Sequence, residues 1–192
     1  MKRRDFIQKT SASTALISLS GIGLSCSRTS ATKITILHTN DVHSHVEAFG
    51  ANSGENSNKG GIAKRATLVE SVRKENPNTL LLDAGDIFQG TPYFNFYGGE
   101  LEFKLMSLLK YDVATIGNHD FDNGINGLYA QLPHAKFDFI SANYDFSNTV
   151  MDSHVKPYKT FMKEGIKIGV FGLGIELSLS LIHISEPTRH RS

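Results

Sequence analysis

Three short apolar runs, each followed by a cluster of polar residues, place the strongest constraint on how this chain can fold. The runs cover residues 33–38, 79–83 and 112–116, and all three are rich in Leu or in β-branched residues. Short runs of this composition that end at Gly, Asn or Asp predict β-strands. They therefore predict three strands whose ends carry reactive side chains.

Helical patterns fill the intervals between these strands. The first predicted helix has Glu70 and Lys74 as a favourable i, i+4 pair on its exposed side, and its apolar face consists of Ile62, Ala63, Ala66, Val69 and Val72. The second predicted helix repeats the apolar pattern with Leu101, Leu105, Leu108 and Leu109. Alternation of strands and helices predicts an α/β fold with a mostly parallel sheet covered by helices.

Three further segments complete the predicted organisation. Residues 51–61 are polar and contain glycines, which predicts a surface loop within the first strand–helix unit. A fourth strand is predicted at 137–142. A hairpin is predicted from 158–163 and 166–173, which meet at a Glu-Gly turn.

Side chains that can bind metals follow each of the first three strands, in residues 40–43, 83–86 and 117–122. Ligands of open α/β sheets bind at the carboxyl ends of the strands. Carboxylate, imidazole and amide donors without thiolates suit Zn, Mn, Fe, Co or Ni. A carboxylate such as Asp86 can bridge two ions, which would clamp a phosphate and lower the pKa of a water that attacks phosphorus.

Longer strings around these positions carry a family resemblance. Asp41-x-His43, Gly85-Asp86 and the run 117–120 (Gly-Asn-His-Asp) resemble the calcineurin-like metallophosphoesterase superfamily. The strings at 36–41, 60–65, 86–92 and 118–122 are similar to its branch of 5′-nucleotidases and UDP-sugar hydrolases. The resemblance covers residues 33–176. It implies a four-layer αββα fold, with two mixed sheets flanked by helices, of which this chain holds the first half.

The resemblance also implies a role for each matching residue. Asp41 and His43 would bind the first of two divalent metal ions, Asp86 would bridge the two, and Asn118 would bind the second. His119 would face the phosphate, where it stabilises charge or protonates the leaving group. Asp122 would accept the ring N–H of His119 and fix its tautomer, as orienting carboxylates do.

Parts of the family pattern have no match in this chain. Three later metal ligands, two histidines and a histidine or glutamine, find no motif after Asn143. The C-terminal domain that supplies the nucleoside pocket is also missing, and it either follows in the same chain or resides on another. The chain as written is therefore expected to be inactive. Its parent is expected to hydrolyse phosphate monoesters of nucleotides, with the choice among nucleotides, UDP-sugars and cyclic nucleotides left open.

The first 31 residues predict export from the cytoplasm. Arg3 and Arg4 precede a short apolar run, which resembles a twin-arginine signal; an ordinary secretory signal with a chance arginine pair is the alternative. Cys26, the single cysteine, follows that run and resembles the acylated cysteine of a lipoprotein. Cleavage after Ala31 is the competing interpretation. The predicted location is the periplasm or the outer surface, with or without a lipid anchor.

The last residues, 177–192, are predicted to be foreign to the protein. Residues 179–189 look like the translation of a sequencing-library adapter. The alternative is a genuine short strand and tail. If the tail is foreign, the natural protein continues beyond Glu176, and residues 32–176 are the N-terminal part of the phosphoesterase domain.

The charge balance argues against nucleic acid as a partner. The net charge of +1 is the sum of two unlike segments. The signal segment has five basic residues and one acidic residue, and the remaining segment, 32–192, has 15 basic and 18 acidic residues. Duplex binding needs clustered Lys and Arg, which a mildly acidic body does not offer. A nucleotide substrate would therefore be held by a specific site.

Several residues also have plain structural interpretations. Asp41 and Asp86 taken alone fit turn or helix-cap positions, and Gly85, Gly90 and Gly117 fit turns. Two interpretations of an aromatic cluster stay open, base stacking and core packing; it comprises Phe88, Tyr93, Phe94, Phe96 and Tyr97. Four histidines are assigned no ligand role, namely His38, His45, His134 and His154. Asp83 is expected to support its loop, and Asp120 to face away from the site.

Two other function classes remain open. One is a sulfur-oxidising thiohydrolase on the same scaffold. The other is a non-catalytic exported protein that binds metal or phosphate through a residual site. The retention of His119 and Asp122 favours an enzyme for the parent protein.

Overall fold

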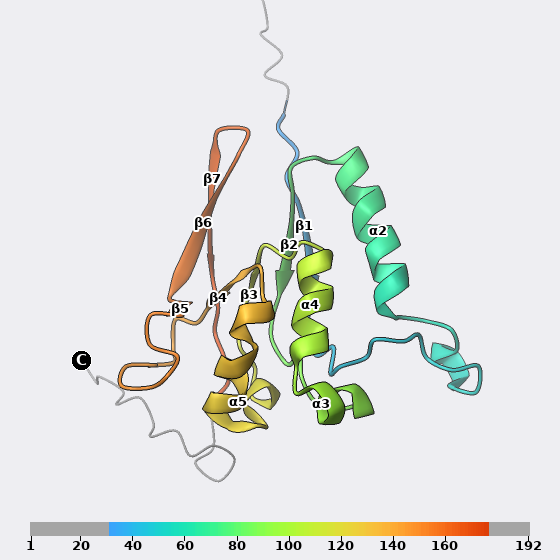
Figure 1. Cartoon of the computed structure of the whole chain (residues 1–192). Helices are drawn as coiled ribbons and strands as arrows, with labels where there is room; N and C mark the ends of the chain where they lie inside the picture. The colour runs from blue at the N-terminus through green and yellow to red at the C-terminus, as the bar shows by residue number, and fades with distance from the viewer. Residues whose placement is uncertain (1–30, 177–192) are drawn as a thin grey trace, which may run out of the picture. The chain divides into compact units, whose positions relative to one another are not determined.

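The structure, a computed structural model, describes residues 31–176 of the 192-residue chain (Figure 1). The predicted export signal with Cys26, apart from its last residue, and the predicted foreign tail at 177–192 lie outside the described residues. Both stay predictions. Within the described part, no helix has the length and apolar character needed to cross a membrane.

Five parallel strands form the main sheet, in the order β1-β2-β3-β4-β5. Their bounds are β1 Thr35–Thr39, β2 Thr79–Asp83, β3 Val113–Ala114, β4 Asp138–Ile140 and β5 Val155–Lys156. Chain order equals spatial order, so each connection moves one step along the sheet. The carboxyl ends of β1, β2 and β3 therefore lie side by side, which is the arrangement that the polar strand ends predicted.

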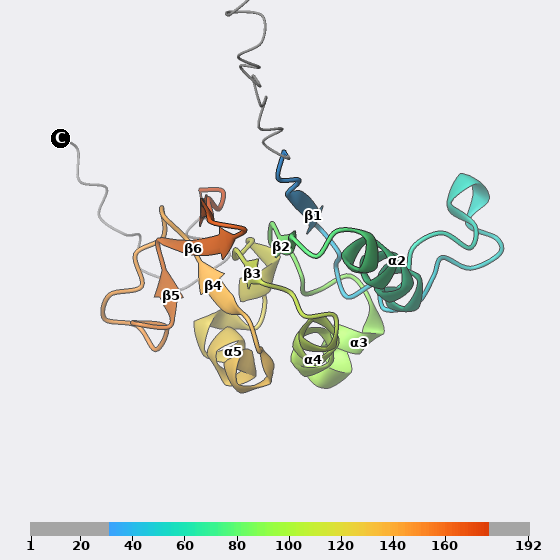
Figure 2. The same ribbon diagram turned by 90° about the horizontal axis from the view of Figure 1, so that it is seen from above.

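Helices cover one face of this sheet, as Figure 2 shows. The α-helices are α2 Ile62–Glu75, α3 Pro92–Tyr97, α4 Glu100–Leu108 and α5 Gly124–Gln131, and the 3₁₀ turns are η1 Gly54–Asn56, η2 His119–Phe121 and η3 Leu132–His134. Connections of one hand between successive parallel strands place their helices on one side. The short α3 and the strand β5 were not predicted. The predicted surface loop at 51–61 is present and contains η1.

A separate antiparallel hairpin consists of β6 Tyr158–Lys163 and β7 Ile166–Phe171, in which Tyr158 pairs with Phe171. It confirms the predicted hairpin, and β7 ends two residues earlier than predicted. Within residues 31–176 the larger sheet is wholly parallel and the hairpin wholly antiparallel. The α/β class is confirmed, while neither sheet is mixed in this part of the chain.

Aromatic residues fill the core between the sheet and its helices. The ring of Phe103 is fully buried, and its centroid lies 4.8 Å from that of Phe88, 5.8 Å from Phe137 and 5.2 Å from Phe139. Burying one such side chain stabilises a fold by roughly 1.5–3 kcal/mol. Because Phe88 lies in the loop after β2, two residues from Asp86, this packing also anchors the segment that carries Asp86.

The packed face of α4 differs from the predicted one. The predicted face included Leu108, but this side chain is 76% exposed, and α4 instead packs on the core through Phe103 and Met106. The large ring of Phe103 removes more apolar surface from water than a leucine does, so it determines which side of the helix turns inward. The prediction of a helix was correct, and its predicted face was correct in part, since Leu109 is buried in the core whereas Leu108 is exposed.

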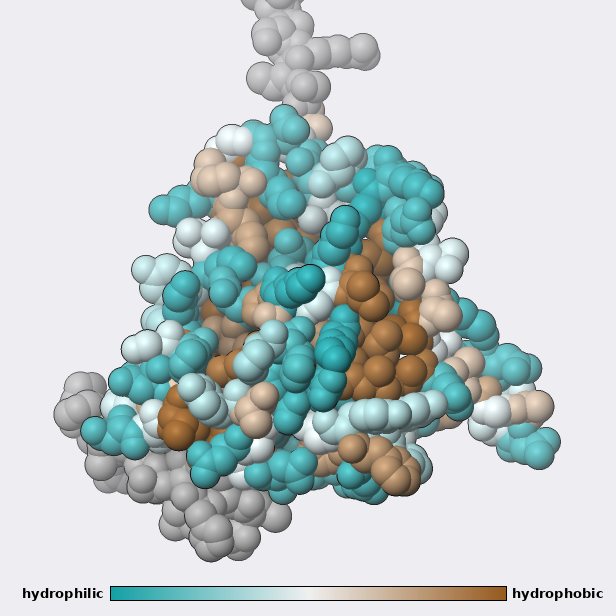
Figure 3. All heavy atoms as spheres, in the orientation of Figure 1, coloured by the Kyte–Doolittle hydropathy of each residue, from teal (hydrophilic) through white to brown (hydrophobic). Residues whose placement is uncertain are grey.

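A shallow hollow lies between α2 and α4, where Figure 3 shows apolar side chains gathered on the surface. Ile62, Leu105 and Met106 line it. Glu102 and Arg65 line it as well, and Glu102 is only 5% exposed. Neither carboxylate oxygen of Glu102 accepts a hydrogen bond from the described residues.

On the solvent side of α2, the predicted Glu70–Lys74 pair is present at 2.9 Å.

Candidate metal centre

Three loops meet at the carboxyl ends of β1, β2 and β3. The loop after β1 runs alongside the loop after β2 through backbone hydrogen bonds. The N–H of Asp41 donates to the carbonyl of Gly85 at 3.0 Å, and the N–H of His43 donates to the carbonyl of Asp86 at 3.0 Å. These bonds fix the relative positions of the first two loops, so the side chains at 41, 43 and 86 are directed to one place.

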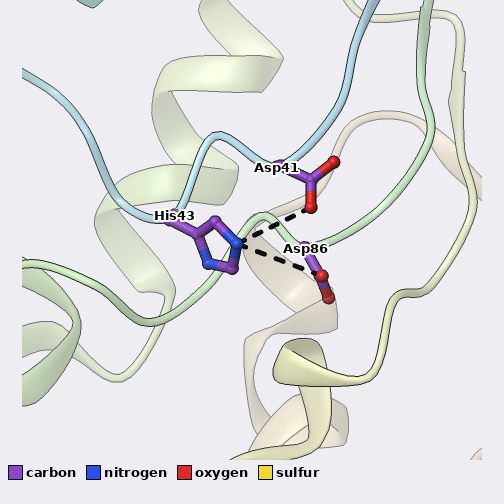
Figure 4. Close-up of side chains that lie close together, drawn as sticks. All are labelled: Asp41, His43 and Asp86. Atoms are coloured by element: carbon purple, nitrogen blue, oxygen red, sulfur yellow. Dashed lines mark ion pairs between the residues drawn. The ribbon is translucent and has the colours of Figure 1, made fainter.

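Asp41, His43 and Asp86 converge there (Figure 4). One potential ligand atom from each lies within 4.8 Å of the others. The Nε2 atom of His43 is 3.7 Å from Asp41 Oδ1 and 4.0 Å from Asp86 Oδ2. The structure thus brings together three of the four predicted ligands, and their assignment as ligands stays a prediction.

The orientation of His43 suits a metal ligand. Its Nδ1 atom lies 3.1 Å from the carbonyl oxygen of Phe88, which can only accept a hydrogen bond, so Nδ1 carries the proton. The other ring nitrogen, Nε2, then faces the carboxylates of Asp41 and Asp86. Three electron-pair donors that face one another are stabilised by a cation between them. Two carboxylates and an imidazole are ligands that borderline divalent ions accept, so the residues fit such an ion.

The backbone at this site adopts conformations that side chains disfavour. The φ angles of Asp41, His43 and Asp86 are 52°, 48° and 55°. Left-handed backbone costs an ordinary residue roughly 1–2 kcal/mol. Such conformations persist only where surrounding contacts fix them, and they are concentrated at functional sites.

Two of the predicted turn glycines are required by close packing between loops. A Cβ atom on Gly85 would lie 2.6 Å from the backbone nitrogen of Gly117. A Cβ atom on Gly117 would overlap the carboxylate of Asp86. Both glycines therefore allow the loops after β2 and β3 to approach each other closely, so that the two loops can share one site.

The loop after β3 contributes the remaining predicted residues. Asn118 is half-buried and directly precedes η2. The N–H of His119 donates to Asp86 Oδ1 at 2.9 Å, and the rings of His119 and His43 are 5.2 Å apart. Asp122 Oδ2 lies 3.0 Å from Nδ1 of His119, and this hydrogen bond raises the pKa of His119 above its ordinary value. The pairing of His119 with Asp122 is present as the resemblance implied, and its catalytic role stays a prediction.

Asp120 was predicted only to face away from the site, but it also holds the backbone of the site together. It is buried and accepts hydrogen bonds from four backbone N–H groups, those of Asp86, Ile87, Phe88 and Gly117. Burial nevertheless raises its pKa to about 7. Asp120 does face away from the cluster of ligand side chains, but it contacts the backbone that carries Asp86. Its place in the Gly-Asn-His-Asp run, beside two predicted site residues, was the available signal.

Asp83 supports its loop, as expected. It accepts hydrogen bonds from the Thr39 hydroxyl at 2.6 Å and from the Gly85 N–H at 2.9 Å. Burial raises the pKa of Asp83 to about 6. Burial, followed by the charges of Asp86 and Asp120, raises the pKa of Tyr144 to about 12.

The remaining aromatic and histidine residues lie either in the core or on the surface, outside the group of predicted ligands. Phe88 and Phe94 stack in the core with centroids 5.2 Å apart, whereas Phe96 is 81% exposed. Core packing thus explains part of the aromatic cluster and leaves the rest on the surface. The ring of His45 packs on Phe49, with centroids 4.6 Å apart, and is not part of the metal-ligand group.

A parallel sheet with two carboxylates and an imidazole at adjacent strand ends is the architecture of a metal-binding α/β protein. Residues 34–187 match the family model described as calcineurin-like phosphoesterase, and the chain belongs to this family. The match extends into the segment assigned to a foreign tail, so that assignment stays a prediction.

Similar proteins include nucleotidases. The chain is 42% identical over 147 residues to the snake venom 5′-nucleotidase of Crotalus adamanteus, which covers 73% of this chain and 25% of the relative. The crystal structure of a 5′-nucleotidase precursor from Thermus thermophilus matches with a TM-score of 0.68 and 40% identity, over 73% of this chain and 28% of that one. The chain thus spans about a quarter of the length of these proteins.

A sulfate thiohydrolase from Thermus thermophilus also matches, with a TM-score of 0.62 over 75% of this chain and 36% of that one. Its identity to this chain is only 14%, so this likeness shows a shared fold alone.

Proposed function

We propose that the protein to which this chain belongs is a metal-dependent hydrolase of nucleotide phosphate monoesters, of the 5′-nucleotidase type. The observation that carries the proposal is the convergence of Asp41, His43 and Asp86 beside the hydrogen-bonded pair of His119 and Asp122. The similarity to 5′-nucleotidases at about 40% identity supports the substrate class.

The proposed cofactor is a pair of divalent ions from the group Zn, Mn, Fe, Co and Ni. Asp41 and His43 would hold the first ion, Asp86 would contact both, and Asn118 would hold the second. Bound ions of this kind neutralise phosphate charge and supply a water of lowered pKa. Further ligands for the second ion would come from residues outside 31–176.

His119 has the proposed role of charge stabiliser or proton donor at the phosphate. Its Nδ1 atom is held by Asp122, so Nε2 is the atom left to face a substrate. The raised pKa of His119 favours the protonated ring, which can donate a proton to a leaving oxygen. Asp122 acts through His119, because it fixes the ring orientation and stabilises its positive charge.

Three proposals concern parts of the protein outside the described residues. The first is export through the N-terminal signal, with Cys26 as lipid attachment site or with cleavage after Ala31. The second is a nucleoside-binding domain beyond this chain. The third is that residues 177–192 are foreign. A snake venom enzyme and a precursor protein among the similar proteins support export to a periplasmic or outer-surface location.

A substrate panel with the full-length product of the gene tests the proposed function. With Mn²⁺ present, we expect phosphate release from a nucleoside 5′-monophosphate and no sulfate release from a thiosulfonate. His119→Ala should reduce the rate by about 10²- to 10⁴-fold, as expected for loss of a general acid or charge stabiliser.

Three outcomes of this panel would contradict the proposal in different ways. Sulfate release with no phosphate release would favour the thiohydrolase alternative. Metal binding without hydrolysis of either substrate would favour the non-catalytic alternative. An unchanged rate in His119→Ala would remove the role assigned to that residue.

A further inference from the structure

The carboxylate of Asp120 is buried between the two loops that follow β2 and β3. Its Oδ1 atom accepts hydrogen bonds from the N–H groups of Ile87 at 2.8 Å and Phe88 at 3.0 Å. Its Oδ2 atom accepts from Asp86 at 3.1 Å and Gly117 at 2.8 Å. One side chain thus joins three consecutive amides of one loop to an amide of the other.

The loop after β2 needs such an acceptor to keep its shape. Four of its residues have positive φ, with 95° at Gly85, 55° at Asp86, 68° at Gln89 and 106° at Gly90. This conformation turns the amides of residues 86–88 toward one point, and consecutive amides arranged in this way attract an anion. Without an acceptor those amides would be buried and unpaired, which is costly. Asp120 is that anion, so the concavity is not available to a substrate phosphate.

A second contact joins the loops after β2 and β3 in the opposite direction. The N–H of His119 donates to Asp86 Oδ1 at 2.9 Å, so each loop offers a carboxylate to the backbone of the other. We propose that Asp120 assembles the metal centre before any metal binds, by fixing the loop that carries Asp86 against the loop that carries Asn118 and His119. Asp120 is a positioning residue, because it contacts the backbone of the site and none of the ligand side chains.

This inference rests on the proposed function in one respect, namely that Asp86 and Asn118 bind metal. The structural part stands on the four hydrogen bonds alone. The two can therefore be tested separately, by measurements that need no substrate.

The first test is amide hydrogen exchange in the full-length wild-type protein after removal of metal with a chelator. The amides of residues 86–88 and of Gly117 should be protected in the metal-free protein, and added Mn²⁺ should change their exchange little. Free exchange that becomes slow only when Mn²⁺ is added would overturn the proposal, because the metal and not Asp120 would then assemble the loops.

The second test is Asp120→Asn, which keeps the shape of the side chain but replaces one acceptor oxygen by an NH₂ group that faces backbone N–H groups. We expect exchange at the four amides to become faster by roughly tenfold or more. The affinity for Mn²⁺ measured by calorimetry should fall by about 10- to 100-fold, as for partners that orient metal ligands.

Asp112→Asn is the matched control, because Asp112 also accepts a backbone N–H, that of Leu81 at 2.7 Å, but lies at the opposite end of the strands. It should leave the Mn²⁺ affinity unchanged within about twofold, even if it lowers the melting temperature as much as Asp120→Asn does. An equal loss of affinity in both variants would assign a general structural role to Asp120 and overturn the proposal. If Asp120→Asn does not fold, the wild-type exchange experiment still decides.

Discussion

The carboxylates at the two ends of the parallel sheet have different ion-pair partners. At the amino ends of the strands, Lys159 Nζ lies 2.9 Å from Asp138 Oδ2, and Arg73 lies 3.7 Å from Asp112. At the carboxyl ends, Asp41 and Asp86 face the Nε2 atom of His43. No lysine or arginine within residues 31–176 forms an ion pair with either of them.

The loops at the carboxyl end also pack unusually closely. Asp41, His43 and Asp86 have positive φ, and the loops that carry them approach so closely that Gly85 and Gly117 have no room for a side chain. The acids at the amino end pair with Lys159 and Arg73, whereas His43 is the ion-pair partner of Asp41 and Asp86 among the described residues. This contrast indicates that the amino end serves stability and the carboxyl end serves binding.

The largest effect should come from removing a proposed ligand at the carboxyl end. In the full-length protein with Mn²⁺, Asp86→Asn should lower phosphate release by more than about 100-fold, since partners that only orient a ligand already account for up to that much. Asp138→Asn makes the same chemical change at the amino end, where an exposed ion pair contributes about 0–1 kcal/mol. The rate of phosphate release by Asp138→Asn should stay within about twofold of wild type. Similar losses in both variants would remove the functional distinction between the ends.

A glycine substitution should test how closely the loops at the carboxyl end approach each other. Gly85 has φ of 95°, and an added Cβ would lie 2.6 Å from the backbone of Gly117. Gly85→Ala should therefore lower the free energy of unfolding by more than about 3 kcal/mol. In Gly169→Ala the added Cβ meets nothing within 4 Å, and the expected change is below about 1 kcal/mol. Denaturant unfolding of the two variants measures the difference, and equal values would contradict the close approach of the loops.

A smaller effect should appear in the pH dependence of stability. Burial raises the pKa of Asp83 from 3.8 to about 6, so the folded protein holds this proton more tightly than the unfolded chain. The contribution of Asp83 to stability is then greatest below pH 4 and decreases as the pH rises to about 6, by at most about 3 kcal/mol. Asp120, with a pKa of about 7, acts in the same direction.

The comparison of wild type with Asp83→Asn isolates this contribution. Unfolding in the presence of a chelator should show the variant gaining stability relative to wild type as the pH rises from 4 to 7. Asn keeps an oxygen that can accept the Gly85 N–H, so the loop contact is not removed outright. Stability curves that run parallel over this range would show that the carboxyl of Asp83 is not perturbed.

Much of the site could be predicted because its residues directly follow apolar strands. Leu80 and Leu81 are almost fully buried, and runs of this kind end where the sheet ends, so the position of Asp86 followed from the pattern. The close approach of His43 to Asp41 and Asp86 follows from the adjacency of β1 and β2. The strand order therefore explains why residues far apart in the sequence meet at one site.

Other features depend on contacts that local patterns do not encode. Asp120 accepts hydrogen bonds from amides of a loop more than thirty residues earlier, and its place in the Gly-Asn-His-Asp run does not reveal these partners. The inward face of α4 was predicted only in part, because Phe103 packs on rings from other elements while Leu108 faces solvent. In both cases tertiary contacts override the local signal.

We propose that the carboxyl end of the sheet is a metal-dependent phosphoesterase site. The most direct measurement is phosphate release from a nucleoside 5′-monophosphate by the full-length protein, before and after a chelator and after Mn²⁺ is returned, in wild type and in Asp86→Asn. We predict that the chelator abolishes release in wild type, that Mn²⁺ restores it, and that Asp86→Asn stays inactive under all three conditions. Release that persists without metal, or that is equal in Asp86→Asn and wild type, would contradict the claim.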